Sequence, residues 1–159
     1  MNGFAKLGLV AACALVGAST VVAQDAAPSP QQQAEMATQT RKGLYDLIGM
    51  NFGPVGGMLK NKVPFDAATV QKNAGRIKVL STMIPEVFQT DTHTFQVKTK
   101  AKENIWTNVA DFGSKADDLQ KAAAALEDAA KTGDKGATLR AAGAVGKACG
   151  ACHDNYRDK

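Results

Sequence analysis

The sequence predicts an all-α fold, an antiparallel up-down-up-down four-helix bundle, and three observations support it. Four segments repeat apolar residues at the helical spacing of three and four. No segment alternates apolar and polar residues as a half-buried strand does. The breaks between the four segments are of lengths that let consecutive helices run in opposite directions as neighbours.

The first 23 residues are expected to be a signal peptide that is removed on export. Lys6 ends a short positive region, residues 7–22 are apolar and uncharged, and residues 21–23 have the small side chains that a signal peptidase needs. The stretch is too short and too rich in Ala and Gly to be preferred as a membrane span. Residues 10–13 leave one alternative, a lipoprotein cleavage site with a lipidated Cys13. We expect export to the periplasm, a flexible leader over residues 24–33 and one domain over residues 34–159.

The first two helices of that domain are expected to be separated by a long connection. The first helix runs to about Phe52, where Gly53 and Pro54 stop it. Its expected inward side comprises Met36, Thr40, Leu44, Leu47, Ile48 and Met50. Residues 53–65 then connect it to a second helix, which begins at the N-cap Asp66 and reaches about Gln89. Pro85 should kink or end this second helix.

The last two helices follow a loop over residues 90–102, which has no clear periodicity. The third helix has the most regular seam, formed by Ile105, Val109, Phe112, Ala116, Leu119, Ala123, Leu126 and Ala130. Gly133 then breaks the chain. The fourth helix is expected over residues 134–158, with an inner stripe of Leu139, Ala142, Val145, Cys149, Cys152 and Tyr156.

The fourth helix carries Cys149-Gly-Ala-Cys152-His153, the C-x-x-C-H attachment pattern of c-type haem. In this chemistry the two thiols add to the haem vinyl groups, and the imidazole binds the iron from one side. On a helix the three side chains share a face, because they are three and four residues apart. A redox disulfide and a zinc site are the alternatives. A redox pair belongs at a helix N-terminus, and zinc needs a fourth ligand, for which the processed chain offers only His93. We therefore expect one covalently attached haem c.

The charge balance excludes one class of partner. The chain has a formal net charge of +4, and its lysines are scattered without interleaved aromatic residues. Nucleic-acid binding is therefore not expected.

Taken together, the signal peptide, the four helices and the terminal Cys-Gly-Ala-Cys-His-Asp-Asn-Tyr-Arg resemble cytochrome c prime, the class II c-type cytochrome family. Further landmarks are Pro-Phe-Asp-Ala-Ala at 64–68, Asn-Ile-Trp at 104–106, and an Arg four residues before a bulky residue at 41–45. The resemblance covers residues 34–159. It implies a pentacoordinate, high-spin haem with an apolar, open side opposite His153.

The resemblance places Tyr45 on that open side of the haem. Relatives with Met at this position bind the iron from both sides and are low-spin electron carriers. A phenol is a poor ligand for ferrous iron and is bulky enough to crowd this face. The alternatives are that Tyr45 is only a core residue, or that a shifted register brings Met36 or Met50 to the iron.

The resemblance also implies roles for four further residues. Arg41 should contact a haem propionate, and Arg157 should overlie the His153 side of the haem. Phe88 and Trp106 should pack near the haem. The structural alternatives are a solvated Arg41, an Arg157 that only complements the helix dipole, and ordinary core packing of the two aromatic residues. His93 is expected to be a solvated loop residue.

The function implied by this resemblance is a periplasmic haem protein that binds nitric oxide and carbon monoxide, buffers or carries nitric oxide, and can transfer electrons. The alternative is a low-spin Met/His-ligated single-electron carrier of the same fold. An enzyme such as a peroxidase is not expected, because no distal His or acid is placed to split a peroxide bond. Family members often dimerise through their first two helices, so we expect a homodimer and a periplasmic redox partner.

Overall fold

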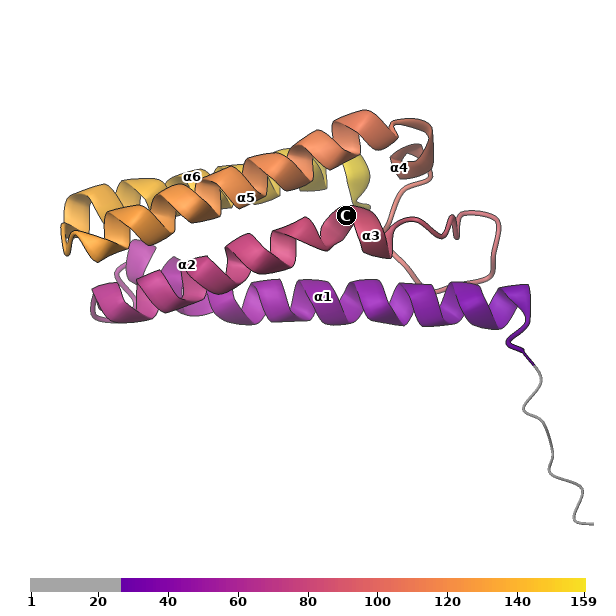
Figure 1. Ribbon diagram of the computed structural model, residues 1–159, viewed down its shortest axis with the longest axis horizontal. Coiled ribbons are helices and arrows are strands. Elements are labelled where there is room, and N and C mark those ends of the chain that lie inside the picture. The colour runs from indigo at the N-terminus through magenta and orange to yellow at the C-terminus, as the bar shows by residue number, and fades with distance from the viewer. Residues whose placement is uncertain (1–26) are drawn as a thin grey trace, which may run out of the picture.

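The computed structural model describes residues 27–159, so the predicted signal peptide, Cys13 and the start of the leader lie outside the described residues. Four long helices make up the bundle: α1 (Pro30–Leu59), α2 (Ala67–Thr82), α5 (Val109–Lys131) and α6 (Lys135–Tyr156). Two short helices, α3 (Ile84–Val87) and α4 (Asn104–Thr107), lie near the connection between α2 and α5. Figure 1 shows α1 and α2 side by side in one layer, with α5 and α6 in the other. The predicted antiparallel four-helix bundle is confirmed.

Helix α1 begins at Pro30, four residues before the predicted domain start. Ser29 caps it: its Oγ accepts a hydrogen bond from the Gln32 amide, and the Gln32 side chain accepts one from the Ser29 amide. This reciprocal pair is a capping box. Pro30 occupies the first turn, where a missing N–H costs nothing. Helix α1 therefore includes part of the segment that was expected to be a flexible leader.

The prediction that Gly53 and Pro54 stop the first helix is wrong. Helix α1 continues through Pro54 to Leu59, so most of the predicted connection is helical. Proline removes one helical hydrogen bond and disfavours a helix interior. Here the continuation buries Val55 and Met58 in the core, and tertiary burial of apolar side chains overrides local propensity.

The predicted inward side of α1 is also partly wrong. Leu44 and Ile48 are buried as expected, but Met36, Leu47 and Met50 are 56%, 46% and 62% exposed. The buried face instead comprises Ala34, Arg41, Leu44, Ile48, Asn51, Val55 and Met58. This face contains a charged and an amide side chain, so apolar character alone did not identify it.

Helix α2 begins as predicted. The Asp66 Oδ1 accepts hydrogen bonds from the amides of Ala68 and Thr69, at 3.0 and 3.4 Å. The helix ends at Thr82, and the chain turns into α3 with Pro85 near its start, as expected for a proline in this pattern. Residues 88–103 contain no helix and fold across the end of the bundle (Figure 1).

The predicted third helix is divided at Asn108, whose backbone is not helical (φ −126°, ψ 45°). The Asn108 Nδ2 donates to the Asn104 carbonyl, and the Asn108 carbonyl accepts from the Phe112 amide. The break turns Val109 outward, so it is 65% exposed rather than part of the seam. The other seven seam residues are buried as predicted.

Helix α6 follows a short turn that contains Gly133 with φ +73°, a conformation that favours glycine. Ala142, Val145 and Tyr156 of its predicted stripe are buried, and both cysteines pack against the core from partly buried positions. Of the four pairs of neighbouring long helices, α1 and α6 make the least extensive contact. The cysteines of α6 lie in this part of the bundle.

Candidate functional site

Cys149, Cys152 and His153 lie on the last two turns of α6. Both cysteines are half-buried against the hydrophobic core, and neither forms a disulfide. His153 is exposed. Helix α6 thus presents two thiols on the inside and one imidazole at its surface.

The raised pKa values of the two thiols argue against redox chemistry, and the surrounding side chains argue against a zinc site. Burial raises the pKa of both Cys149 and Cys152, and Cys149 adds to the rise at Cys152. A redox-active cysteine needs a lowered pKa, because the thiolate is the reactive form. Within residues 27–159, no three His, Cys, Asp or Glu side chains gather to hold a metal ion. The disulfide and zinc alternatives therefore have no support in this site.

His153 is suited to bind a metal as a neutral imidazole. Its pKa lies below the ordinary value of 6.5, first because part of the ring is buried and second because of the positive charge of Arg157. Asp154 acts in the opposite direction. The ring nitrogen is therefore free of a proton at neutral pH, which is the form that ligates iron.

Arg157 lies just beyond the helix that carries His153. Its backbone is extended (φ −126°, ψ 133°), because α6 ends at Tyr156 rather than near Asp158 as predicted. Helical spacing therefore does not place its side chain over His153. Its amide donates to the His153 carbonyl at 3.2 Å, and its charge still lowers the His153 pKa.

Tyr45 of α1 faces the two cysteines of α6. Its pKa is strongly raised, mainly by burial, and both Cys152 and Cys149 contribute to the rise. The phenol of α1 and the two thiols of α6 therefore lie near one another inside the bundle. Its ring also meets Phe88 edge to face, with 6.3 Å between the centroids. Helix α1 thus brings an aromatic residue to the side of the bundle that the cysteines face.

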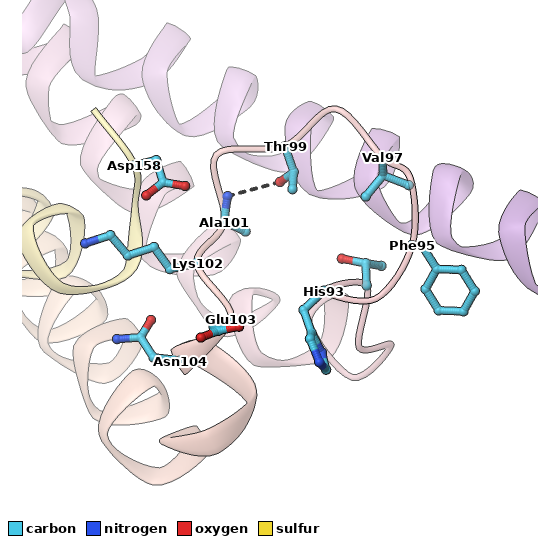
Figure 2. Close-up of a pocket in the computed structure, with 10 residues that line it drawn as sticks. His93, Phe95, Val97, Thr99, Ala101, Lys102, Glu103, Asn104 and Asp158 are labelled. Atoms are coloured by element: carbon cyan, nitrogen blue, oxygen red, sulfur yellow. Dashed lines mark hydrogen bonds between the residues drawn. The ribbon is translucent and has the colours of Figure 1, made fainter.

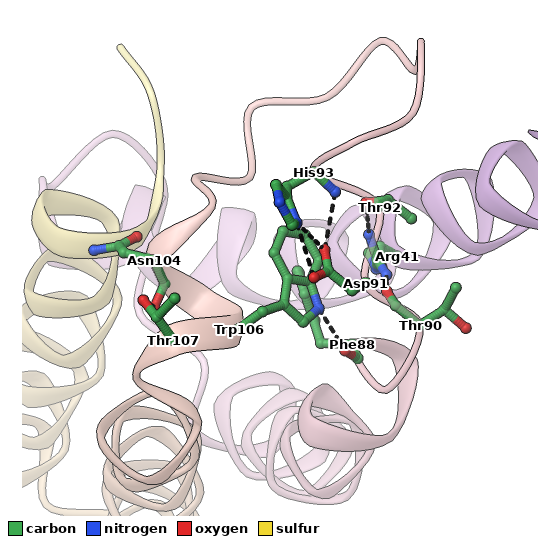
Figure 3. Close-up of polar contacts among 9 residues, drawn as sticks. All are labelled: Arg41, Phe88, Thr90, Asp91, Thr92, His93, Asn104, Trp106 and Thr107. Atoms are coloured by element: carbon green, nitrogen blue, oxygen red, sulfur yellow. Dashed lines mark hydrogen bonds and ion pairs between the residues drawn. The ribbon is translucent and has the colours of Figure 1, made fainter.

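An aromatic cluster forms one wall of the same region. The centroid of the Phe88 ring lies 6.2 Å from that of Trp106 and 4.8 Å from that of Phe112. The Trp106 indole N–H donates to the Phe88 carbonyl at 2.9 Å (Figure 3). Phe112 in turn stacks edge to face on Tyr156, at 5.2 Å. The sequence predicts a place near the haem for Phe88 and Trp106, whereas it indicates only buried helical positions for Phe112 and Tyr156.

Arg41 is 3% exposed, so it is not the solvated surface residue of the alternative. Its guanidinium donates hydrogen bonds to the Thr90 carbonyl and the Thr92 hydroxyl (Figure 3). It also donates one to the Val87 carbonyl. It lies over the Phe88 ring, 4.5 Å from the centroid. Burial lowers its pKa, and this is opposed mainly by the charge of Asp91.

The positive charge of Arg41 is only partly balanced by the side chains of residues 27–159. Among residues 27–159, no carboxylate lies within 4.0 Å of it. Three of its five N–H groups are engaged by the loop oxygens, which leaves about two. A buried cation normally requires a paired anion. A haem propionate would supply one, and that contact stays a prediction.

His93 is an exposed loop residue, as predicted, and it also contacts its neighbours. Its Nδ1 lies 2.7 and 2.8 Å from the two carboxylate oxygens of Asp91. Its ring lies beside Trp106, with 6.2 Å between the centroids (Figure 3). This imidazole belongs to the polar network around Arg41 and is not part of the cysteine site.

These residues together fit a haem c. Two protonated thiols and one neutral imidazole supply the attachment and the iron ligand, and Tyr45 with the aromatic cluster supplies an apolar wall. Arg41 supplies a buried positive charge beside that wall. No helix among residues 27–159 is long and apolar enough to cross a membrane.

Comparisons with known proteins agree with this site. The family model described as cytochrome c' matches residues 36–157. Cytochrome c' from Cereibacter sphaeroides is 35% identical over 143 residues, which cover 89% of this chain and 95% of that protein. The structure of cytochrome c prime from Shewanella frigidimarina is 38% identical, with a TM-score of 0.73 over 79% of this chain and 97% of that one. A nitric oxide complex of a mutant cytochrome c prime from Alcaligenes xylosoxidans is 32% identical, with a TM-score of 0.70 over 79% and 97%.

Proposed function

The chain belongs to the cytochrome c' family and so carries one covalently attached haem c, and from this premise we propose that it is a periplasmic gas-binding protein with one protein ligand to the iron. In this proposal His153 is that ligand, and the iron's opposite side stays open to nitric oxide or carbon monoxide. When bound, the haem supplies a metal centre with a free coordination position. The chain supplies attachment, orientation and a water-poor pocket.

The observation that carries the proposal is the absence of a second ligand near Tyr45 among residues 27–159. Met36 and Met50, the two methionines considered as ligands, are mostly exposed on the outer side of α1. Met58 is buried, but it lies 13 residues beyond Tyr45, about 20 Å along the helix axis. These positions disfavour the low-spin Met/His alternative.

The pocket wall also bears on which gas would bind. Tyr45, Phe88 and Phe112 present mainly aromatic surface, which suits small diatomic molecules of low polarity. The Tyr45 hydroxyl is the one polar group that this wall is expected to offer. Its raised pKa keeps it protonated and neutral at physiological pH. We expect nitric oxide and carbon monoxide to be favoured over dioxygen, because the wall is crowded and offers a bound gas no hydrogen-bond donor beyond the Tyr45 hydroxyl. The Alcaligenes relative whose structure is a nitric oxide complex supports this choice.

An absorption spectrum of the reduced holoprotein, with and without carbon monoxide, tests the proposal. A high-spin spectrum that changes on gas addition is the expected result. The variant Tyr45→Met should convert the spectrum to low-spin and reduce gas binding, whereas Tyr45→Leu should keep the high-spin form. A wild-type protein that is already low-spin and six-coordinate without gas would contradict the proposal.

Four further statements complete the proposal. We propose export to the periplasm, as the predicted signal peptide implies, and no enzymatic turnover. We propose a homodimer through α1 and α2, whose outer sides expose Met36, Leu47, Met50 and Val79. Exposed apolar residues on neighbouring helices are typical of subunit interfaces. A periplasmic redox partner is proposed on the haem alone.

A further inference from the structure

The end of α6 is capped by a distant segment of the chain. A helix leaves its last four carbonyls without helical partners. In α6 the His153 carbonyl accepts from the Arg157 amide. The other three accept from residues 102–104, through the contacts Lys102 Nζ to Asp154 O (3.3 Å), Asn104 Nδ2 to Asn155 O (3.2 Å) and Lys102 N to Tyr156 O (3.1 Å). The turn that carries His153 is thus capped mainly by residues about 50 positions earlier.

The same segment also pairs with the chain beyond the helix. Ala101 and Arg157 form an isolated antiparallel bridge, and the Asp158 amide donates to the Lys100 carbonyl at 2.8 Å. Figure 2 shows Asp158 on the C-terminal segment beside Ala101 and Lys102. We call residues 100–104 the strap. It holds both the last turn of α6 and the residues that follow it.

A second attachment joins the last turn to α5. Tyr156 is buried, and its hydroxyl donates to the Asp111 Oδ2 at 2.5 Å. This hydrogen bond is the main cause that raises the pKa of Tyr156 to about 12, and it also lowers the pKa of Asp111. Tyr156 is three residues after His153, so its anchorage restrains the helical turn that presents the imidazole.

We propose that the strap and the Tyr156–Asp111 hydrogen bond are positioning elements for His153, and that they set how strongly its imidazole binds the haem iron. None of these groups needs to touch the haem. They act by preventing the end of α6 from fraying, since a terminal turn without cap or tertiary contacts opens readily. The inference rests on the role of His153 as iron ligand in the proposed function.

The proposal has a consequence for gas binding. If a bound gas were to weaken the bond between the iron and His153, an imidazole on a loosely held turn would be lost more readily. A restrained turn keeps His153 near the iron and favours its return. The strap would therefore influence how long a bound gas is retained, in addition to the aromatic wall around Tyr45.

Three single variants of the holoprotein test the proposal: Tyr156→Phe, Asp111→Asn and Asn104→Ala. Tyr156→Phe is the principal one, because it removes one hydroxyl and keeps the buried ring. We expect amide hydrogen exchange at Arg157 and Asp158 to become about 2- to 10-fold faster, the factor expected for losing one hydrogen bond. The iron–histidine stretching frequency of the reduced protein should fall in the same variants.

Thr138→Val is the matched control. It removes a buried hydroxyl that donates to the Asp134 carbonyl at the other end of α6, at 2.6 Å. It should lower overall stability without changing the iron–histidine frequency or the exchange at residues 157 and 158. An unchanged frequency in all three test variants, or a change of equal size in the control, would overturn the proposal.

Failure of the strap proposal can be distinguished from failure of the proposed gas-binding function. A six-coordinate wild-type iron would contradict the open site but leave the strap testable, because hydrogen exchange and the midpoint potential of the haem could still be compared between variants. In that case the strap variants should still shift the potential, and Thr138→Val should not. Equal midpoint potentials of the haem in all of these proteins would contradict the proposed role of the strap.

Discussion

A guanidinium that is removed from water must regain its hydrogen bonds and its counter-charge from the protein. Arg41 regains three hydrogen bonds, one from the last residue of α3 and two from the loop that follows this helix. Its guanidinium also lies over the rings of Phe88 and Trp106. The negative charge of Asp91 opposes the lowering of the Arg41 pKa that burial causes. One side chain of α1 thus organises the loop that closes the bundle end.

The Arg41→Lys variant should be less stable by about 2–4 kcal/mol, because an ammonium group cannot reproduce the three-way fork of a buried guanidinium. Urea unfolding of the holoprotein measures this change. The exposed Arg140 provides the control, and Arg140→Lys should change the free energy of unfolding by less than about 0.5 kcal/mol. Equal stabilities for the two variants would show that the loop contacts of Arg41 contribute little.

A second prediction concerns Tyr156 and the stability of the fold at alkaline pH. Its pKa is raised to about 12 in the folded protein, against about 10 for an unfolded chain. A raised pKa stabilises the fold fully below the unfolded value, and this contribution is lost as pH rises from about 10 to 12. Tyr156→Phe should therefore show a smaller loss of urea stability over that range than the wild type. The pKa of Tyr45 is raised as well, so part of the loss of stability should persist in the variant. Parallel curves for the two proteins would contradict the assignment.

At the scale of single elements, α1 shows burial overriding local propensity. Pro54 lacks the amide that would donate to the Met50 carbonyl, yet the helix runs through it to Leu59. The residues that follow bury Val55 and Met58 against the other helices. At about 25 cal/mol per Å², burying two such side chains offsets the loss of one helical hydrogen bond.

The Pro54→Ala variant should therefore be more stable than the wild type by about 1–3 kcal/mol, because it restores the missing donor. Pro30→Ala is a suitable control, since Pro30 lies in the first turn, where the missing amide has no partner to lose. The control should change stability by less than about 1 kcal/mol. Chemical denaturation of both proteins measures the difference, and a destabilised Pro54→Ala would indicate that the ring itself packs favourably.

At the scale of the whole molecule, the bundle covers the inner faces of its helices but leaves apolar side chains outside. Leu47 and Met50 of α1 are 46% and 62% exposed, although the same helix buries Leu44 and Ile48. A second copy of the chain is the partner proposed for these residues. The two faces of α1 would then serve the bundle core and the dimer.

The Leu47→Glu variant should weaken dimerisation at least tenfold, because a carboxylate in an apolar interface loses its hydration without gaining a partner. Sedimentation velocity of the holoprotein over a range of concentrations measures this effect. Lys42→Glu is the control on the exposed surface of α1 and should leave the dimer intact. A wild-type protein that is monomeric at all concentrations would contradict the proposed interface.

The sequence by itself determined the class of the fold, the start of α2 and the cofactor. Helical periodicity is a local property, a cap such as Asp66 acts within three residues, and the C-x-x-C-H chemistry is contained in five adjacent residues. These features need no information from distant parts of the chain, and so they could be read directly.

Only the tertiary structure decided where α1 ends, which of its faces is buried and what holds the end of α6. Each depends on contacts between residues far apart in sequence: Val55 and Met58 with the core, Arg41 with the 87–92 segment, and Tyr156 with Asp111. Local patterns carry no record of such contacts, because the free energy that favours them appears only when the helices pack together.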